Sequence, residues 1–135
     1  MKRREQALLL LRKAAQDEAL LDQVLTSAQV SDEIIGFHCQ QAAEKILKAL
    51  LSDLGVRFRK THEIGALIAL LAQAGHALPE QFENLDVLTP FGAIYRYEDY
   101  DAPVSLDRVA ARKLLRELRV WVEAKLQKST PMADE

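Results

Sequence analysis

The sequence predicts an all-α protein, an antiparallel up-and-down bundle of four to five helices. Leu and Ala dominate the apolar residues and only 6% of residues are aromatic, a balance that favours helices over sheets. Apolar residues recur at helical spacing along several long stretches that short connections separate. The 135 residues suit one domain. We therefore expect a single bundle over residues 1–128 and a frayed tail over 129–135.

The first two helices have clear limits. One helix is predicted over residues 3–25, and a second follows Ser31, whose side chain can cap it. This second helix should stop at Gly55, because glycine accepts the left-handed backbone that ends many helices. On the first helix, the face expected to meet the core carries Leu8, Leu11, Ala15, Ala19 and Val24.

Three further helical segments follow a short basic connection at residues 56–60. The third helix is expected over residues 62–74, with Thr61 as its N-cap. A fourth should begin near Pro79 and break or kink at Pro90, before a short segment at residues 91–97. Ser105 can cap a last helix that reaches about residue 126.

Composition and charge argue against several classes of function. The net charge of −2 argues against wholesale contact with a nucleic-acid backbone, although a local basic face stays possible. Cys39 has no second cysteine to pair with, and no Cys/His spacing suggests zinc, so we expect no metal or cofactor. The N-terminal apolar run ends after four residues, too short for a signal peptide or a membrane span. We expect a cytoplasmic protein.

A polar stripe runs along the second helix, opposite its apolar face. Four of its side chains fall within an arc of about 80°, and Glu44 lies at the edge of that arc. Ammonium groups, an imidazole and an amide in one row can hold phosphate oxygens. The alternative is a solvated surface with an ordinary Glu44–Lys48 pair. The four residues are His38, Gln41, Lys45 and Lys48.

Residues 37–51 read FHCQQAAEKILKALL and resemble the second-helix signature of HEPN domains, approximately FHxQQAxEKxLKALL. Three more stretches resemble landmarks of that family, in the right order. They are the A-x-x-D element that ends at Asp17, the GV and KTHEI of residues 55–56 and 60–64, and the LTPF and YRY of residues 88–91 and 95–97. This resemblance implies a helical bundle that is commonly a homodimer. It also implies a minimal nucleotidyltransferase as partner, in a toxin–antitoxin-like pair, and some HEPN proteins are metal-independent ribonucleases.

The ribonuclease motif of that family, Arg-x4–6-His, is incomplete in this chain. Arg96 takes the place of the arginine, but no histidine follows within reach. Asp101 is a weak substitute, since its carboxyl has a reference pKa of about 3.9 and its acidic surroundings repel RNA. Arg96 can instead pair with Asp17 or Glu44 inside the bundle. We expect a binding module rather than an enzyme, with Arg96 and Asp101 as weak catalytic candidates.

A second Arg-x4-His spacing, from Arg57 to His62, lies away from the catalytic position that the resemblance implies. His62 is expected to act locally, at the start of the third helix. Arg57, Arg59 and Lys60 nevertheless form a compact basic patch which, with His62, can attract an anion.

Three aromatic residues have competing interpretations. Tyr97 or Tyr100 can stack a base, cap the core or accept a nucleotide from the partner transferase, as the resemblance implies for some members. Trp121 shares a helical face with Leu114 and Leu118, which favours a core or dimer contact.

Three hypotheses about function follow. The first is a HEPN dimer that partners a minimal nucleotidyltransferase and binds a nucleotide or RNA; the others are a divergent ribonuclease toxin and a purely structural homodimer. The candidate nucleotide or RNA contacts are His38, Gln41, Glu44, Lys45, Lys48, Arg96 and Tyr97.

Overall fold

The computed structural model describes residues 2–92 and 105–128, and within these ranges it contains helices and no strand. The all-α prediction is confirmed. None of the described helices is long and apolar enough to cross a membrane. The elements in chain order are α1 (Arg3–Val24), α2 (Asp32–Leu54), α3 (Ile64–Gln73), the 3₁₀ helix η1 (Glu80–Gly92) and α5 (Arg108–Lys128).

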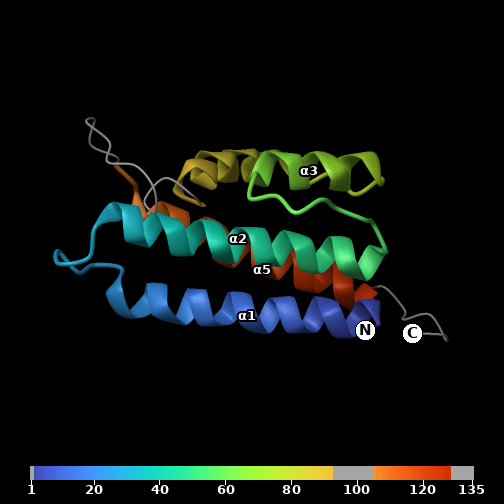
Figure 1. Ribbon diagram of the computed structural model, residues 1–135, viewed down its shortest axis with the longest axis horizontal. Helices are drawn as coiled ribbons and strands as arrows, with labels where there is room; N and C mark the ends of the chain where they lie inside the picture. The colour runs from blue at the N-terminus through green and yellow to red at the C-terminus, as the bar shows by residue number, and fades with distance from the viewer. Residues whose placement is uncertain (1, 93–104, 129–135) are drawn as a thin grey trace.

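Helix α2 lies at the centre of the bundle and packs against all the other elements (Figure 1). Helix α1 lies antiparallel along one side, α5 lies behind, and α3 and η1 form a layer on the opposite side from α1. The apolar face of α2 that lies opposite the predicted polar stripe is buried, apart from half-buried Leu54. Its fully buried residues include Ile35, Cys39, Ala42, Ala43, Ile46, Leu47 and Leu51.

Both predicted ends of α2 are confirmed. The Ser31 hydroxyl accepts a hydrogen bond from the Ile34 amide at 3.3 Å. Gly55 has a φ of 73°, and its amide donates to the Ser52 carbonyl at 3.1 Å, which satisfies one of the last carbonyls of the helix.

The buried face of α1 is rotated from the predicted one, with Leu11 common to both and Val24 packed against the core. Its buried residues are Ala7, Leu11, Ala14, Glu18 and Leu21, whereas Leu8 is 43% exposed. Hydrophobic periodicity misses this face because it includes the charged Glu18. The burial of Glu18 depends on arginine partners from α5 that are distant in sequence.

The predicted N-cap of α3 is wrong. The helix begins at Ile64, and the Thr61 hydroxyl accepts a hydrogen bond from the Glu63 amide at 3.1 Å, one residue before the helix. The first helical amides bind side chains of η1 instead: Ile64 N donates to Thr89 Oγ1 at 3.0 Å, and Gly65 N donates to Asp86 Oδ1 at 2.8 Å. A neighbouring element therefore caps α3.

Two other predicted limits differ. η1 continues through Pro90 to Gly92, so the expected break at Pro90 does not occur, although the tighter 3₁₀ geometry replaces an α-helix over the whole segment. Helix α5 begins at Arg108 rather than after Ser105. Asp107 supplies the cap, because its Oδ1 accepts from Ala110 N at 3.0 Å. The predicted tail lies outside the described residues.

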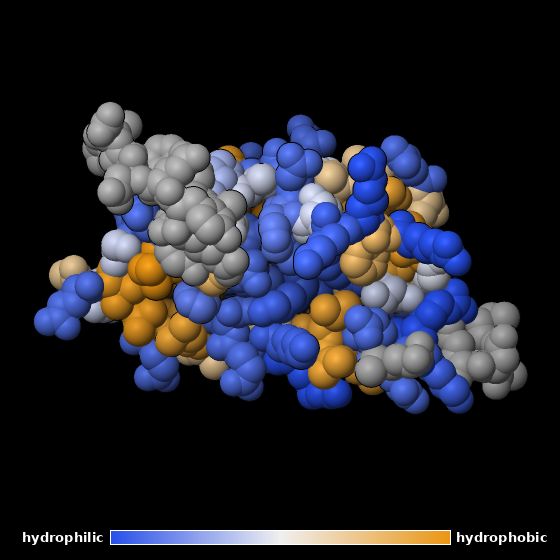
Figure 2. Space-filling view, in the orientation of Figure 1, coloured by the Kyte–Doolittle hydropathy of each residue, from blue (hydrophilic) through white to orange (hydrophobic). Residues whose placement is uncertain are grey.

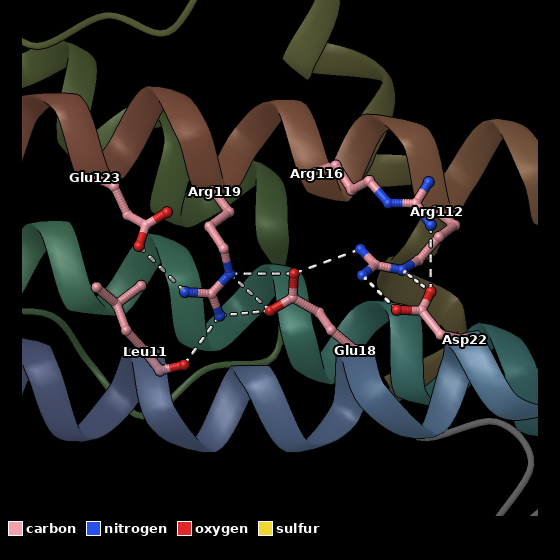
Figure 3. Close-up of polar contacts among 7 residues, drawn as sticks. All are labelled: Leu11, Glu18, Asp22, Arg112, Arg116, Arg119 and Glu123. Carbon is pink, nitrogen blue, oxygen red and sulfur yellow. Dashed lines mark hydrogen bonds and ion pairs between the residues drawn. The ribbon is translucent and has the colours of Figure 1, made fainter.

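A cluster of ion pairs joins α1 to α5 (Figure 3). The buried Glu18 carboxylate accepts hydrogen bonds from Arg112 and from Arg119, which lies about two turns later on α5. Arg112 also binds both oxygens of Asp22, at 2.7 and 3.1 Å. The pairing matters because an isolated buried charge is strongly unfavourable.

Arg108, at the start of α5, holds the loop between α1 and α2. Its guanidinium binds Asp32 Oδ1 at 2.7 Å and donates to the carbonyls of Leu25, Ser27 and Val30. One side chain thereby satisfies three loop carbonyls, which helices cannot pair.

We predict that Glu18→Gln destabilises the fold by about 3 kcal/mol, since it removes the shared charge between two arginines and keeps the side-chain volume. Urea denaturation measures the change. Arg116→Ala is the control, because Arg116 is exposed and pairs with Asp22 at the surface, and it should cost less than about 1 kcal/mol. Equal losses in both variants would contradict the importance of burial.

We also predict an acid-sensitive contribution from Asp22. The hydrogen bond from Arg112 lowers the pKa of this carboxyl below its usual value of 3.8. The resulting stability is present above that value and disappears as the pH falls through the lowered pKa of the folded protein. In Asp22→Asn, the unfolding free energy from urea melts should therefore fall less steeply between pH 5 and pH 2.5, conditions chosen around the reference pKa of about 3.9. Glu83→Gln, at an exposed carboxylate, should retain the wild-type slope.

Candidate functional site

The polar stripe of α2 faces α1 on one side and residues 56–63 on the other. We call residues 56–63 the connector. It leaves the end of α2 and runs back along that helix before α3 begins, so α2 and α3 point in the same direction (Figure 1). Figure 2 shows this face of the molecule, where a hydrophilic band crosses the middle between apolar patches.

Asp17 of α1 forms the first polar cluster with the stripe. Its carboxylate lies 2.9 Å from His38 Nδ1 and accepts a hydrogen bond from Lys45 Nζ at 2.7 Å. The Asp17 side chain is 11% exposed, so much of this contact is shielded from solvent. The A-x-x-D element of the first helix therefore pairs directly with the signature of the second.

Glu44 forms the second cluster. Its buried carboxylate accepts from Gln40 Nε2 at 2.9 Å and from Lys48 Nζ at 3.2 Å, and it lies 2.7 Å from His62 Nδ1. Gln40 also donates to the His62 carbonyl at 3.0 Å and accepts from Gln41 at 2.8 Å. The KTHEI segment of the connector thus rests on the α2 signature.

These contacts change the interpretation of the stripe. Each of its two lysines has a carboxylate partner at hydrogen-bond distance, so the positive charges are compensated within the protein. The stripe is only partly exposed, and its side chains join α1, α2 and the connector. Sequence reasoning did not single out Gln40, although the QQ pair of the signature was the available signal.

The basic side chains of the connector differ from the lysines of the stripe in their ion pairing. Within the described residues, Arg57, Arg59 and Lys60 form no ion pair or hydrogen bond through their side chains, and all three are exposed. They line a depression of about 470 Å³ between the connector and α3. Its other lining residues are Phe58, Thr61, Glu63, Ala66, Ala69, Leu70 and Gln73.

Phe58 links the basic connector to the stripe. The ammonium group of Lys48 lies 5.6 Å from the centroid of its ring, within the range of a cation–π contact. Lys48 therefore contacts both Glu44 and the connector.

This arrangement can bind an anion, since unpaired guanidinium and ammonium groups lie beside apolar and aromatic surface. Among the described residues, no group of three or more His, Cys, Asp or Glu side chains is placed to hold a metal ion. Burial raises the pKa of the Cys39 thiol to about 12, which leaves little of the reactive thiolate near neutral pH.

Four candidates from the sequence, Arg96, Tyr97, Tyr100 and Asp101, lie outside the described residues. Trp121 packs against the core beside Phe82, with ring centroids 6.3 Å apart. His62, the end of the second Arg-x4-His spacing, contacts Glu44 and precedes α3 rather than forming part of it.

A protein-family model matches the chain over most of its length. A family model described as HEPN domain matches residues 7–128, which is most of the chain. The comparisons with curated proteins and with solved structures gave no match. The matched span includes the Asp17 and Glu44 clusters and the connector. The chain therefore belongs to the HEPN domain family.

Proposed function

We propose that this HEPN domain binds a nucleotide or RNA through its connector and works as a dimer with a minimal nucleotidyltransferase, in a toxin–antitoxin-like pair. Anion binding is supported by the geometry of the connector. The choice of a nucleotide or RNA, and of the partner, rests on the family.

One observation carries the binding proposal: among the residues that the structure describes, the basic side chains of the connector have no ion-pair partner, whereas those of the neighbouring stripe are paired. Residues 56–63 hold three basic side chains and one acidic, a local balance of +2 with His62 neutral, in a chain of net charge −2. Unpaired cations can release counterions when phosphates bind, which is a main source of nucleic-acid affinity.

The depression also offers a surface for the base of a nucleotide. Phe58, Ala66 and Leu70 give it aromatic and aliphatic surface next to the cations. Aromatic surface can stack a base with little sequence preference, and guanidinium groups can hold the phosphate. Arg96 and Tyr97 remain further proposed contacts, on the family resemblance alone.

In this proposal the stripe supports the site. Lys45 and Lys48 remain paired with the carboxylates of Asp17 and Glu44, and Glu44 also contacts His62 of the connector. His38 contacts Asp17 of α1, and Gln41 donates to Gln40, which contacts the connector. Both side chains are proposed as secondary contacts of the nucleotide or RNA.

Exposed valines support a protein partner. Val87 of η1, with Val109 and Val120 of α5, are 65–68% exposed, well above the exposure of the core apolar residues. Apolar surface of this kind can become part of a protein contact.

We predict that the triple variant Arg57→Ala/Arg59→Ala/Lys60→Ala binds a single-stranded RNA oligonucleotide, and ATP, at least tenfold more weakly than wild type. The slope of log K against log salt for RNA should fall by about 2, because each lost phosphate contact contributes roughly 0.7. Fluorescence anisotropy over a salt series measures both quantities.

The matched control is Arg12→Ala/Lys13→Ala/Lys113→Ala, which removes the same charge from exposed helical positions and should have a much smaller effect. If wild type binds neither probe at low salt, the binding proposal is wrong. Electrophoresis of the same RNA tests the ribonuclease alternative, for which metal-independent cleavage should disappear in Arg96→Ala.

We predict that the protein co-purifies with a minimal nucleotidyltransferase encoded by a neighbouring gene when the two are co-expressed. Val109→Glu/Val120→Glu should weaken that association without loss of folding, because both positions are exposed. Analytical size exclusion with light scattering reports the complex and the dimer. Separate elution of the two wild-type proteins would contradict the partnership.

A further inference from the structure

We infer that Glu44 is a positioning residue for the anion site: this buried carboxylate holds His62, and through it fixes the connector in its binding geometry. The inference rests on the proposed function, since it concerns how the same site is built. It assigns a role to a negative charge beside a site for anions.

The connector is attached at two points of His62. The imidazole Nδ1 lies 2.7 Å from Glu44 Oε1, and the backbone carbonyl accepts from Gln40 Nε2 at 3.0 Å. At the other end, the cap at Gly55 fixes the departure of the chain from α2. The basic residues lie between these two attachments, so the loss of His62 would free one end of the segment that carries them.

Glu44 is itself held firmly. Its side chain is 8% exposed and has contacts from Gln40, Lys48 and His62. Lys48 balances the carboxylate charge and also lies over the Phe58 ring. One carboxylate is therefore linked to the connector directly at His62 and indirectly at Phe58.

The two walls of the depression have separate supports. The α3 wall depends on Asp86 and Thr89 of η1, which bind the first amides of that helix. The connector wall has helical hydrogen bonds only at its ends among the described residues, from Val56 N to the Leu51 carbonyl and from Leu67 N to the Glu63 carbonyl, and between them the contacts of His62 with α2 hold it. A free connector would lose conformational entropy when it binds a ligand, which weakens the affinity.

Positioning and direct electrostatics predict opposite results. Loss of the negative Glu44 should strengthen anion binding if only charge matters. Loss of its support for the connector should weaken binding. The His62 variants test positioning without removing the buried charge. The His62 side chain is 51% exposed, and its replacement leaves Glu44 paired with Lys48.

The test compares His62→Ala, His62→Asn and Glu44→Ala with wild type, using the same RNA oligonucleotide and salt series. His62→Ala should bind roughly tenfold more weakly with an unchanged salt slope, because the three cations still meet phosphates in the bound state. His62→Asn, whose amide can donate to Glu44, should recover most of the affinity. Glu44→Ala, if folded, should also bind more weakly.

His76→Ala is the matched control. It removes the imidazole of a histidine that follows α3 and lies outside the connector. Its RNA affinity should stay within about twofold of wild type. Hydrogen exchange gives an independent readout, since His62→Ala should accelerate amide exchange in residues 56–63 and His76→Ala should not.

Unchanged affinity and unchanged exchange in His62→Ala would overturn the inference. A salt slope lower by about 0.7 in that variant would also overturn it, because His62 would then contact a phosphate itself. If wild type binds no RNA, the proposed function fails, and the exchange experiment still decides whether Glu44 and His62 hold the connector.

Discussion

The structure depends on one constraint: α2 is enclosed by every other element, so the polar side chains on it must find partners inside the protein. A buried carboxylate without hydrogen-bond donors is strongly unfavourable. Glu44 meets this requirement through Lys48 one helical turn later, Gln40 one turn earlier and the imidazole of His62 in the connector. The same contacts that pay for its burial determine the path of the chain after α2.

The α1–α5 contact follows the same rule at the back of the bundle. There the shared carboxylate is Glu18, and the donors are arginines of α5. The two helices meet through long charged side chains rather than a tight apolar seam, which gives this contact geometric specificity through the planar guanidinium groups. The bundle thus has an apolar centre with polar contacts at two of its faces.

The sequence predicted the helices well, because their apolar periodicity, the Ser31 cap and the Gly55 stop are local signals. It also identified Glu44, Lys48 and His62 as candidates, and the Glu44–Lys48 pair that it raised as an alternative is present. It could not join His62 to Glu44 or Asp17 to Lys45, since these pairs lie 18 and 28 residues apart. The caps of α3 were missed for the same reason: Asp86 and Thr89 belong to another element. Whether a charged side chain is paired or free is a property of the folded chain, and it separates the stripe from the connector.

The Arg108 side chain has a consequence for the order in which the protein is completed during synthesis. The loop that joins the first two helices gives three of its carbonyls to a residue near the start of the last helix. A ribosome adds roughly 5–20 residues per second, so the N-terminal hairpin waits on the order of several seconds before this arginine is made. During that interval these three carbonyls lack the Arg108 donor that they have in the folded chain. The hairpin can form early, but its closed end becomes native only when the C-terminal helix arrives.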